Sequence, residues 1–198
     1  MKKLKLFFAT CFLVFSLNIN SQQVANFTYL DVPTQEIGNF LRLHKEVTDL
    51  TMEHREFQNH WLLTHFQGGG SNVVIWSNYP TVEDVYKDNA LEAIGKTWES
   101  LEGEEKENFE KTVSEYLSYW NGHTDEIRVI DWDNNVRHSE DHDWDSRFFV
   151  LFENYETTGN TDQVGSAYNN WLIFPGIDQG SIQSGGFSSH LSGGGSDL

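Results

Sequence analysis

The chain has 198 residues, a formal net charge of −17 and 14% aromatic residues. Such an acidic surface repels phosphate groups, so we do not expect nucleic acids or anionic membranes to be partners. The aromatic content is too high for a disordered acidic chain, and we therefore expect a folded protein.

Residues 1–21 have the three-part layout of a secretory signal peptide. Lys2, Lys3 and Lys5 form a basic start, and an apolar run follows from residue 6 to residue 17. This run is too short to span a bilayer. We expect a secreted or periplasmic mature chain without a membrane span. The only cysteine, Cys11, leaves with the signal, so disulfides and thiolate sites are excluded from the mature chain.

A first structural unit is predicted over residues 22–131. Alternating side chains predict a strand over residues 24–32, and apolar residues spaced by three and four predict a helix over residues 36–57. Strands are predicted over residues 61–66 and 73–76, on either side of a glycine-rich turn, and these make a hairpin.

The second half of this unit is mainly helical. Thr81, with Asp84 three residues later, forms a capping pattern that opens helical sequence. Helix-forming residues continue to Trp120 with a break near Gly103, and a fourth strand is predicted over residues 126–131. The order strand, helix, strand, strand, helix, strand is that of an α+β, ferredoxin-like βαββαβ unit.

Residues 132–146 are predicted to be an acidic linker, and residues 147–198 a partial second copy of the unit. The copy is expected to contain a strand over residues 147–155 and a short helix that ends before Pro175. The sequence His65 to Asn72 recurs as His190 to Asp197 with five of eight positions identical. The repeat predicts an internal duplication whose second copy is incomplete, so that the chain is a fragment. A flexible glycine-rich tail is the alternative interpretation.

The strand order, the tandem copies and the aromatic hairpin resemble the dimeric α/β-barrel superfamily, and in particular its exported tandem-unit members. This resemblance implies two ferredoxin-like units that place their sheets together as a pseudo-dimeric barrel. Haem-degrading members use an asparagine on the first strand, a sheet tryptophan and a histidine on the second helix. Asn26 and Trp76 could match the first two, but no histidine lies between Thr81 and Trp120.

Six residues are candidates for a ligand site. Imidazole beside indole could act as an acid or base or as a ligand, which points to His65 next to Trp61. A structural role for His65 in fixing the glycine-rich turn is the favoured alternative, and for His44 a satisfied histidine in the core. Strand side chains that converge inside a barrel could form an aromatic cavity. The candidates are His65, Trp61, Trp76, His44, Tyr29 and Asn26.

The sequence patterns that could indicate a cofactor or a metal site are incomplete. The alternating aspartates at Asp141, Asp143 and Asp145 lack the glycine and glutamate of a calcium loop. We therefore predict no cofactor and no metal. The leading hypothesis is binding of a small apolar or aromatic ligand. A surface interaction or assembly module, with a possible homo-oligomer, is the alternative, and a cofactor-independent monooxygenase is third.

Overall fold

The computed structural model describes residues 22–65 and 70–193. Its main sheet is antiparallel and has the strand order β2-β3-β1-β4-β7. The strands are β1 (Gln22–Leu30), β2 (Asn59–Thr64), β3 (Val73–Tyr79), β4 (Thr124–Asp131) and β7 (Ser189–Gly193). A smaller sheet pairs β5 (Val136–His138) with β6 (Ser184–Gly186). The predicted α+β class is confirmed. The predicted barrel is not, because in the described residues the main sheet is open, with β2 and β7 at its edges.

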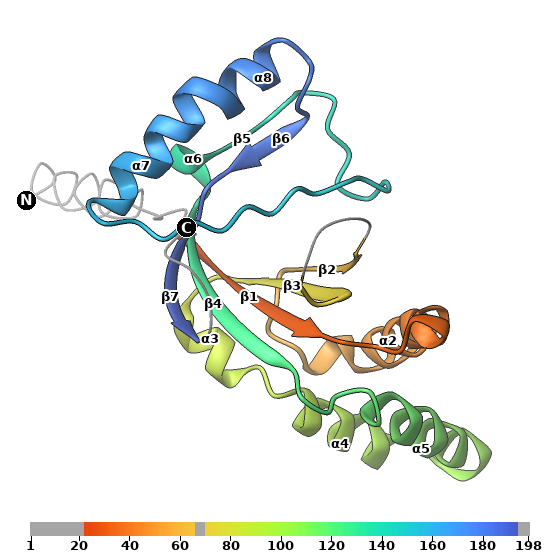
Figure 1. The fold of residues 1–198 in the computed structure, drawn as a ribbon. Helices are drawn as coiled ribbons and strands as arrows, with labels where there is room; N and C mark the ends of the chain where they lie inside the picture. The colour runs from red at the N-terminus through yellow and green to blue at the C-terminus, as the bar shows by residue number, and fades with distance from the viewer. Residues whose placement is uncertain (1–21, 66–69, 194–198) are drawn as a thin grey trace, which may run out of the picture.

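Helices cover one face of the main sheet, which we call the helix face (Figure 1). They are α2 (Ile37–Thr51), α3 (Val82–Lys87), α4 (Ala90–Ser100) and α5 (Gly103–Leu117). The apolar spacing of α2 places Phe40 and Leu43 on its inner side, where both are fully buried. They pack against Leu30 of β1 and Ile75 of β3. This core holds the helices on the sheet.

The helix boundaries follow local signals. Thr81 accepts a hydrogen bond from the Asp84 amide at the start of α3, as the capping pattern predicts. The break between α4 and α5 falls at Gly103, which has a φ of +55°. A short 3₁₀ turn, η1 (Thr34–Glu36), precedes α2, and another, η2 (Met52–His54), follows it. The predicted helix over residues 36–57 is therefore too long, because Arg55 is already extended.

The opposite side of the sheet, which we call the far face, is covered by later parts of the chain. Trp132 of α6 (Trp132–Asn135) and Val136 of β5 pack on a cluster formed by Ala25, Phe27 and Ile130. Figure 1 shows the remaining helices, α7 (Thr161–Tyr168) and α8 (Phe174–Asp178), beside β5 and β6. The acidic segment after residue 131 thus contains a helix and a strand that the sequence reading missed.

The helix expected to end before Pro175 continues through it. A π-helical turn, η3 (Asn169–Ile173), links α7 to α8, and Pro175 lies in the first turn of α8. Pro175 stands where the hydrogen-bond spacing changes from π-helical to α-helical, and not inside a regular α-helix. The prediction was therefore wrong about where the helical segment ends.

The predicted second copy also differs from the structure. Residues 147–155 carry no regular secondary structure, so the predicted strand is wrong. His190 lies in β7, which pairs with β4 of the main sheet. Most of the glycine-rich turn after His65 and the end of the second repeat lie outside the described residues, as does the predicted signal peptide. None of the helices in the described ranges is long and apolar enough to cross a membrane.

Candidate functional site

The structure divides five of the six candidate residues between the two faces of the sheet, and the sixth, His65, follows the end of β2. Tyr29, Trp61 and Trp76 lie on the far face, because residues paired across neighbouring strands point to the same side. Asn26 of β1 lies on the helix face, and His44 of α2 packs against that face. The structure therefore brings three of the six predicted residues together.

Three large rings form a continuous row across the far face. Trp61 pairs with Trp76, and Trp76 pairs with Phe27 in the next strand. The ring centroids are 4.7 Å apart for the two tryptophans and 5.3 Å apart for Phe27 and Trp76. Trp61 and Trp76 are half-buried, so parts of both rings face solvent. We call this set the aromatic row.

Two rings from later in the chain pack on the aromatic row. Phe152 lies 5.6 Å from the Phe27 ring in an edge-on arrangement, and Trp144 lies 5.7 Å from Trp61. Both come from the irregular part of the chain between β5 and α7. The aromatic residues that sequence reasoning placed in a cavity therefore stack on one another and on this covering chain.

A polar row lies next to the aromatic row on the same face. In register across the sheet it consists of Asn59, Asn78, Arg128 and His190, with the small Ala25 between Asn78 and Arg128. Asn78 is fully buried, and its side-chain oxygen accepts a hydrogen bond of 2.7 Å from the Trp76 indole N–H. Within this row, Nδ2 of Asn78 and Nε2 of His190 are buried and have no hydrogen-bond partner among the described residues. These buried polar atoms are the unusual feature of the far face.

A buried ion pair links the two rows. A guanidinium nitrogen of Arg128 lies 2.7 Å from a carboxylate oxygen of Glu126, and both side chains are almost fully buried. Tyr29 donates a hydrogen bond of 3.0 Å to the other oxygen of Glu126. Burial raises the pKa of Tyr29, and the adjacent Glu126 carboxylate raises it further. Tyr29 is therefore a proton donor and not a base.

The two repeated histidines lie at opposite edges of the sheet. His65 follows β2, and its exposed side chain is far from β7, which carries His190. The His65 main-chain N–H donates a hydrogen bond of 2.9 Å to the Asn72 carbonyl, closing the base of the hairpin. His190 stands beside Arg128. The repeat therefore does not bring its two histidines into one site.

A second polar network lies under the helices. Nδ1 of His44 is 3.0 Å from the Tyr116 hydroxyl, and Nε2 of His44 is 2.8 Å from Nε2 of His60. Nδ1 of His60 is 2.8 Å from the Ser77 hydroxyl. Asn26 is the register neighbour of Ser77, and its Oδ1 is buried without a hydrogen-bond partner in the described part of the chain. We call these five residues, Asn26, His44, His60, Ser77 and Tyr116, the histidine relay.

The contact between the two imidazoles of the histidine relay holds a single proton. One shared proton bridges the two Nε2 atoms, so a second proton there would place two donors against each other. Burial lowers the pKa of His44, and His60 and Arg55 add to this effect. Burial also lowers the pKa of His60, again with a contribution from Arg55. The prediction that His44 is a satisfied core histidine fits these contacts.

A buried ion pair supports the same region. Arg55 donates two hydrogen bonds of 2.7 Å to the Asp88 carboxylate, and Tyr79 donates a third of 2.7 Å. Burial of Asp88 would raise its pKa, but the bonds from Arg55 and Tyr79 outweigh this effect and lower the pKa. Arg55 also lies 4.8 Å from the centre of the Phe57 ring. These contacts fix the chain between α2 and β2.

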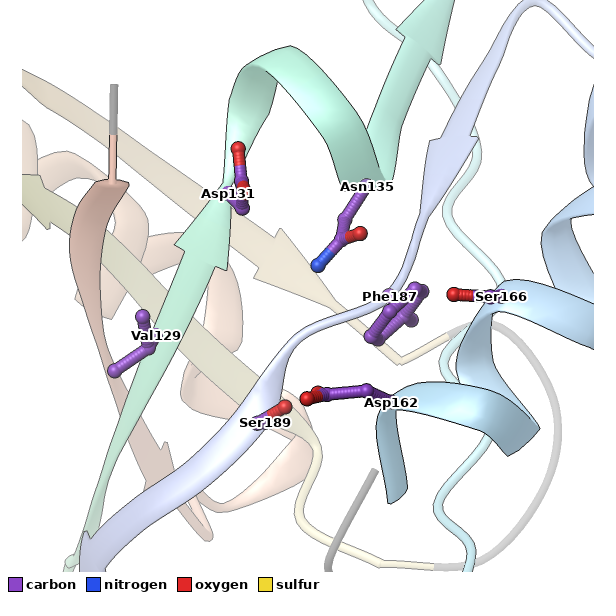
Figure 2. Close-up of a pocket in the computed structure, with 7 residues that line it drawn as sticks. All are labelled: Val129, Asp131, Asn135, Asp162, Ser166, Phe187 and Ser189. Atoms are coloured by element: carbon purple, nitrogen blue, oxygen red, sulfur yellow. The ribbon is translucent and has the colours of Figure 1, made fainter. Parts of the chain in front are cut away.

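A small pocket of about 280 Å³ lies outside both networks, between β4, α6 and α7 (Figure 2). Its lining is mostly polar and consists of Val129, Asp131, Asn135, Asp162, Ser166, Phe187 and Ser189. Asp131 accepts a hydrogen bond from the Asn134 amide, which explains its position as a helix cap. Phe187 packs closely on Gly165, where a methyl group would meet its ring at 2.5 Å. The helix cap explains the position of Asp131, and the packing on Gly165 explains the position of Phe187.

Several residues of these networks were missed from the sequence. His60 shares the helix face with Leu62, which the alternation of β2 could have shown. His60 was not identified as a candidate because the strand was predicted to begin at residue 61. Glu126 and Arg128 were assigned to a strand, but nothing local indicated their burial. In the part of the chain that the structure describes, no group of three or more His, Cys, Asp or Glu side chains could hold a metal ion.

Comparison of the chain with protein-family models, with curated proteins and with solved structures finds no match.

Proposed function

We propose that this chain is an exported protein that binds a small, flat and mostly apolar molecule on the far face of its sheet. The observation that carries the proposal is the pairing of the aromatic row with buried polar atoms that lack partners. Phe27, Trp61 and Trp76 offer ring surface, and Nδ2 of Asn78 is a buried donor without an acceptor. Such a combination of apolar walls and a few polar groups is typical of ligand sites.

The two rows specify the chemistry of the ligand. Aromatic side chains favour a planar ring system, since offset or edge-on stacking contributes about 0.5–1.5 kcal/mol beyond burial. A buried donor without a partner costs about 1–3 kcal/mol, which an acceptor on the ligand would recover. Arg128 is already paired with Glu126, so a strongly anionic ligand is not required. We therefore favour a mostly apolar molecule that carries one carbonyl, ether or sulfonyl acceptor.

The fold proposal is that residues 22–131 form a ferredoxin-like unit of the dimeric α/β-barrel kind. The order of elements and the neighbouring strands β2-β3-β1-β4 support it. In this arrangement one sheet face is covered by helices and the other is left for a second layer. Here the second layer is the chain after residue 131, and the ligand would lie between this layer and the aromatic row.

The test is binding of anilinonaphthalene sulfonate, a probe with two aromatic ring systems and a sulfonate whose oxygens are acceptors, to the chain from residue 22 onward. We expect saturable fluorescence enhancement in wild type and a loss of affinity of about tenfold in Trp76→Leu, because a stacking ring is removed. Native mass spectrometry of the same sample reports bound molecules directly.

The matched control is Trp98→Leu. Trp98 lies on α4, where it donates a hydrogen bond to Glu110, and it is remote from the aromatic row. Near-UV circular dichroism of each variant verifies that the fold is retained, since the probe also binds loosened proteins. Equal binding by wild type and Trp76→Leu, or an equal loss in both tryptophan variants, would contradict the proposal.

A further inference from the structure

The small pocket between β4, α6 and α7 contains polar side chains that the fold does not use. Asn135 ends α6, Asp162 and Ser166 lie on α7, and Ser189 begins β7. Among the described residues, no hydrogen bond or ion pair engages any of these four side chains. Asp131 differs from them, because both of its carboxylate oxygens accept hydrogen bonds at the start of α6. The pocket therefore offers four polar side chains to a ligand.

An aromatic ring forms one wall of the same pocket. Phe187 lies between β6 and β7, and a methyl group added at Gly165 would lie 2.5–2.6 Å from three carbons of its ring. One face of the ring is therefore packed on the main chain of α7. The ring is only half-buried and lines the pocket, and Figure 2 shows Asn135, Asp162 and Ser166 around it. A ligand in the pocket would contact this ring as well as the polar side chains.

The mixture of groups limits the class of ligand. The lining contains two carboxylates and no basic residue, so it repels phosphate and other anions. An apolar ligand would leave the polar side chains without partners. An ammonium group only donates hydrogen bonds, whereas the Asn135 amide and the two serine hydroxyls also have hydrogens to donate. A hydroxyl group both donates and accepts, and it therefore pairs with every polar side chain in the lining.

The size of the pocket and its aromatic wall narrow the class further. Its volume of about 280 Å³ is at the lower end of the range for small-molecule sites, about 300–1,000 Å³. This space suits one six-membered ring and not a chain of several. A pyranose carries hydroxyl groups around its edge and C–H groups on its faces. These C–H groups pack favourably on an aromatic ring, whose faces carry partial negative charge.

We propose that the pocket between β4, α6 and α7 binds a neutral monosaccharide. The sugar ring lies against Phe187, and its hydroxyl groups pair with Asn135, Asp162, Ser166 and Ser189. The carboxylate of Asp162 is the strongest acceptor of the four, because hydrogen bonds to charged groups are stronger than those between neutral groups. The pocket is separate from the aromatic row, so this site does not depend on the ligand proposed for the far face.

Nuclear magnetic resonance titration of the ¹⁵N-labelled chain from residue 22 onward with glucose, galactose and mannose tests the proposal. At least one of these sugars should produce saturable shifts in the amide signals of the residues that line the pocket. Asp162→Ala should weaken binding about tenfold, because a charged acceptor is lost. Ser166→Leu should abolish binding, because the larger side chain occupies the pocket. Both side chains are exposed, so both variants are expected to keep the fold, which the same spectra report.

Each variant has a matched control. Asp133→Ala removes the same charge from an exposed position on α6, and Gln163→Leu introduces the same side chain at an exposed position on α7. Neither residue lines the pocket. Both controls, and Trp76→Leu on the far face, should bind the sugar like wild type. The proposal is overturned by the absence of saturable shifts with all three sugars, by wild-type affinity in Asp162→Ala or Ser166→Leu, or by tighter binding of the diamine putrescine than of any sugar.

Discussion

The two faces of the main sheet are covered in different ways. On the helix face, α2 presents one apolar side to the sheet and one polar side to water, and Phe40 and Leu43 are completely buried. On the far face, the cover is an irregular chain whose apolar side chains point both inward and outward. An amphipathic helix completes its own burial, whereas in the irregular chain Leu151 and Phe152 remain exposed. Stability therefore resides mainly in the helix face, and the proposed contacts belong to the far face.

The largest effect should come from truncation under the helices. Phe40→Ala removes a fully buried ring that lies 5.9 Å from Tyr116 and 5.8 Å from His44. The resulting cavity is expected to lower the free energy of unfolding by about 3–5 kcal/mol. Urea unfolding followed by far-UV circular dichroism measures this. A loss below about 1 kcal/mol would mean that the helix face is not the main core.

A more gradual effect on the same face should appear as the pH is lowered. The folded state lowers the pKa of both His44 and His60, so below about pH 6.5 the unfolded chain binds protons that the folded chain does not. Stability is therefore complete above pH 6.5 and falls as the pH decreases, by up to about 1.4 kcal/mol per pH unit for each histidine. Urea unfolding at intervals between pH 7 and 4.5 measures the slope.

His60→Gln should reduce that slope by about half, because one of the two titrating groups is removed. The control is His138→Gln, which changes an exposed histidine at the end of β5 and should keep the wild-type slope. The carboxyl of Asp88, whose pKa is lowered, contributes only at more acidic pH and does not obscure this range. Identical slopes in all three proteins would show that the histidine relay does not control acid stability.

The smallest effect should come from the far face. Phe152→Ala removes a ring that is already 44% exposed, so the cost is expected to be about 1 kcal/mol. The same change uncovers the ring of Trp76, whose centroid lies 6.3 Å from that of Phe152. Quenching of tryptophan fluorescence by iodide should therefore increase. A cost as large as that of Phe40→Ala would remove the distinction between the two faces.

The sequence predicted the elements whose pattern is local. β1, α2, β3 and the helices after Thr81 were found because alternation, apolar spacing and a cap identify them. The strand predicted over residues 147–155 is absent from the structure. Its local pattern is that of a strand, but a strand forms only where another strand is in reach to pair with it. The sequence of a segment does not show which neighbour the fold supplies.

The site shows the same limit. Strand alternation places Tyr29, Trp61 and Trp76 on one face of the sheet, whereas the histidine relay was missed because it joins α2 to β2. The buried pair of Glu126 and Arg128 was missed for a related reason. Charged residues are rarely buried, and only the cover from later parts of the chain makes them so.

The pairing of β7 with β4 has a consequence for the order of folding. β4 and β7 are neighbours in the sheet, although α6, α7 and α8 lie between them in the chain. Closing so long a loop costs on the order of 3–4 kcal/mol of chain entropy before the strand makes its contacts. Local contacts form faster than distant ones. The edge strand β7 should therefore join last, after the sheet from β1 to β4 and its helices have assembled, and it should be the first element of that sheet to exchange its amide hydrogens.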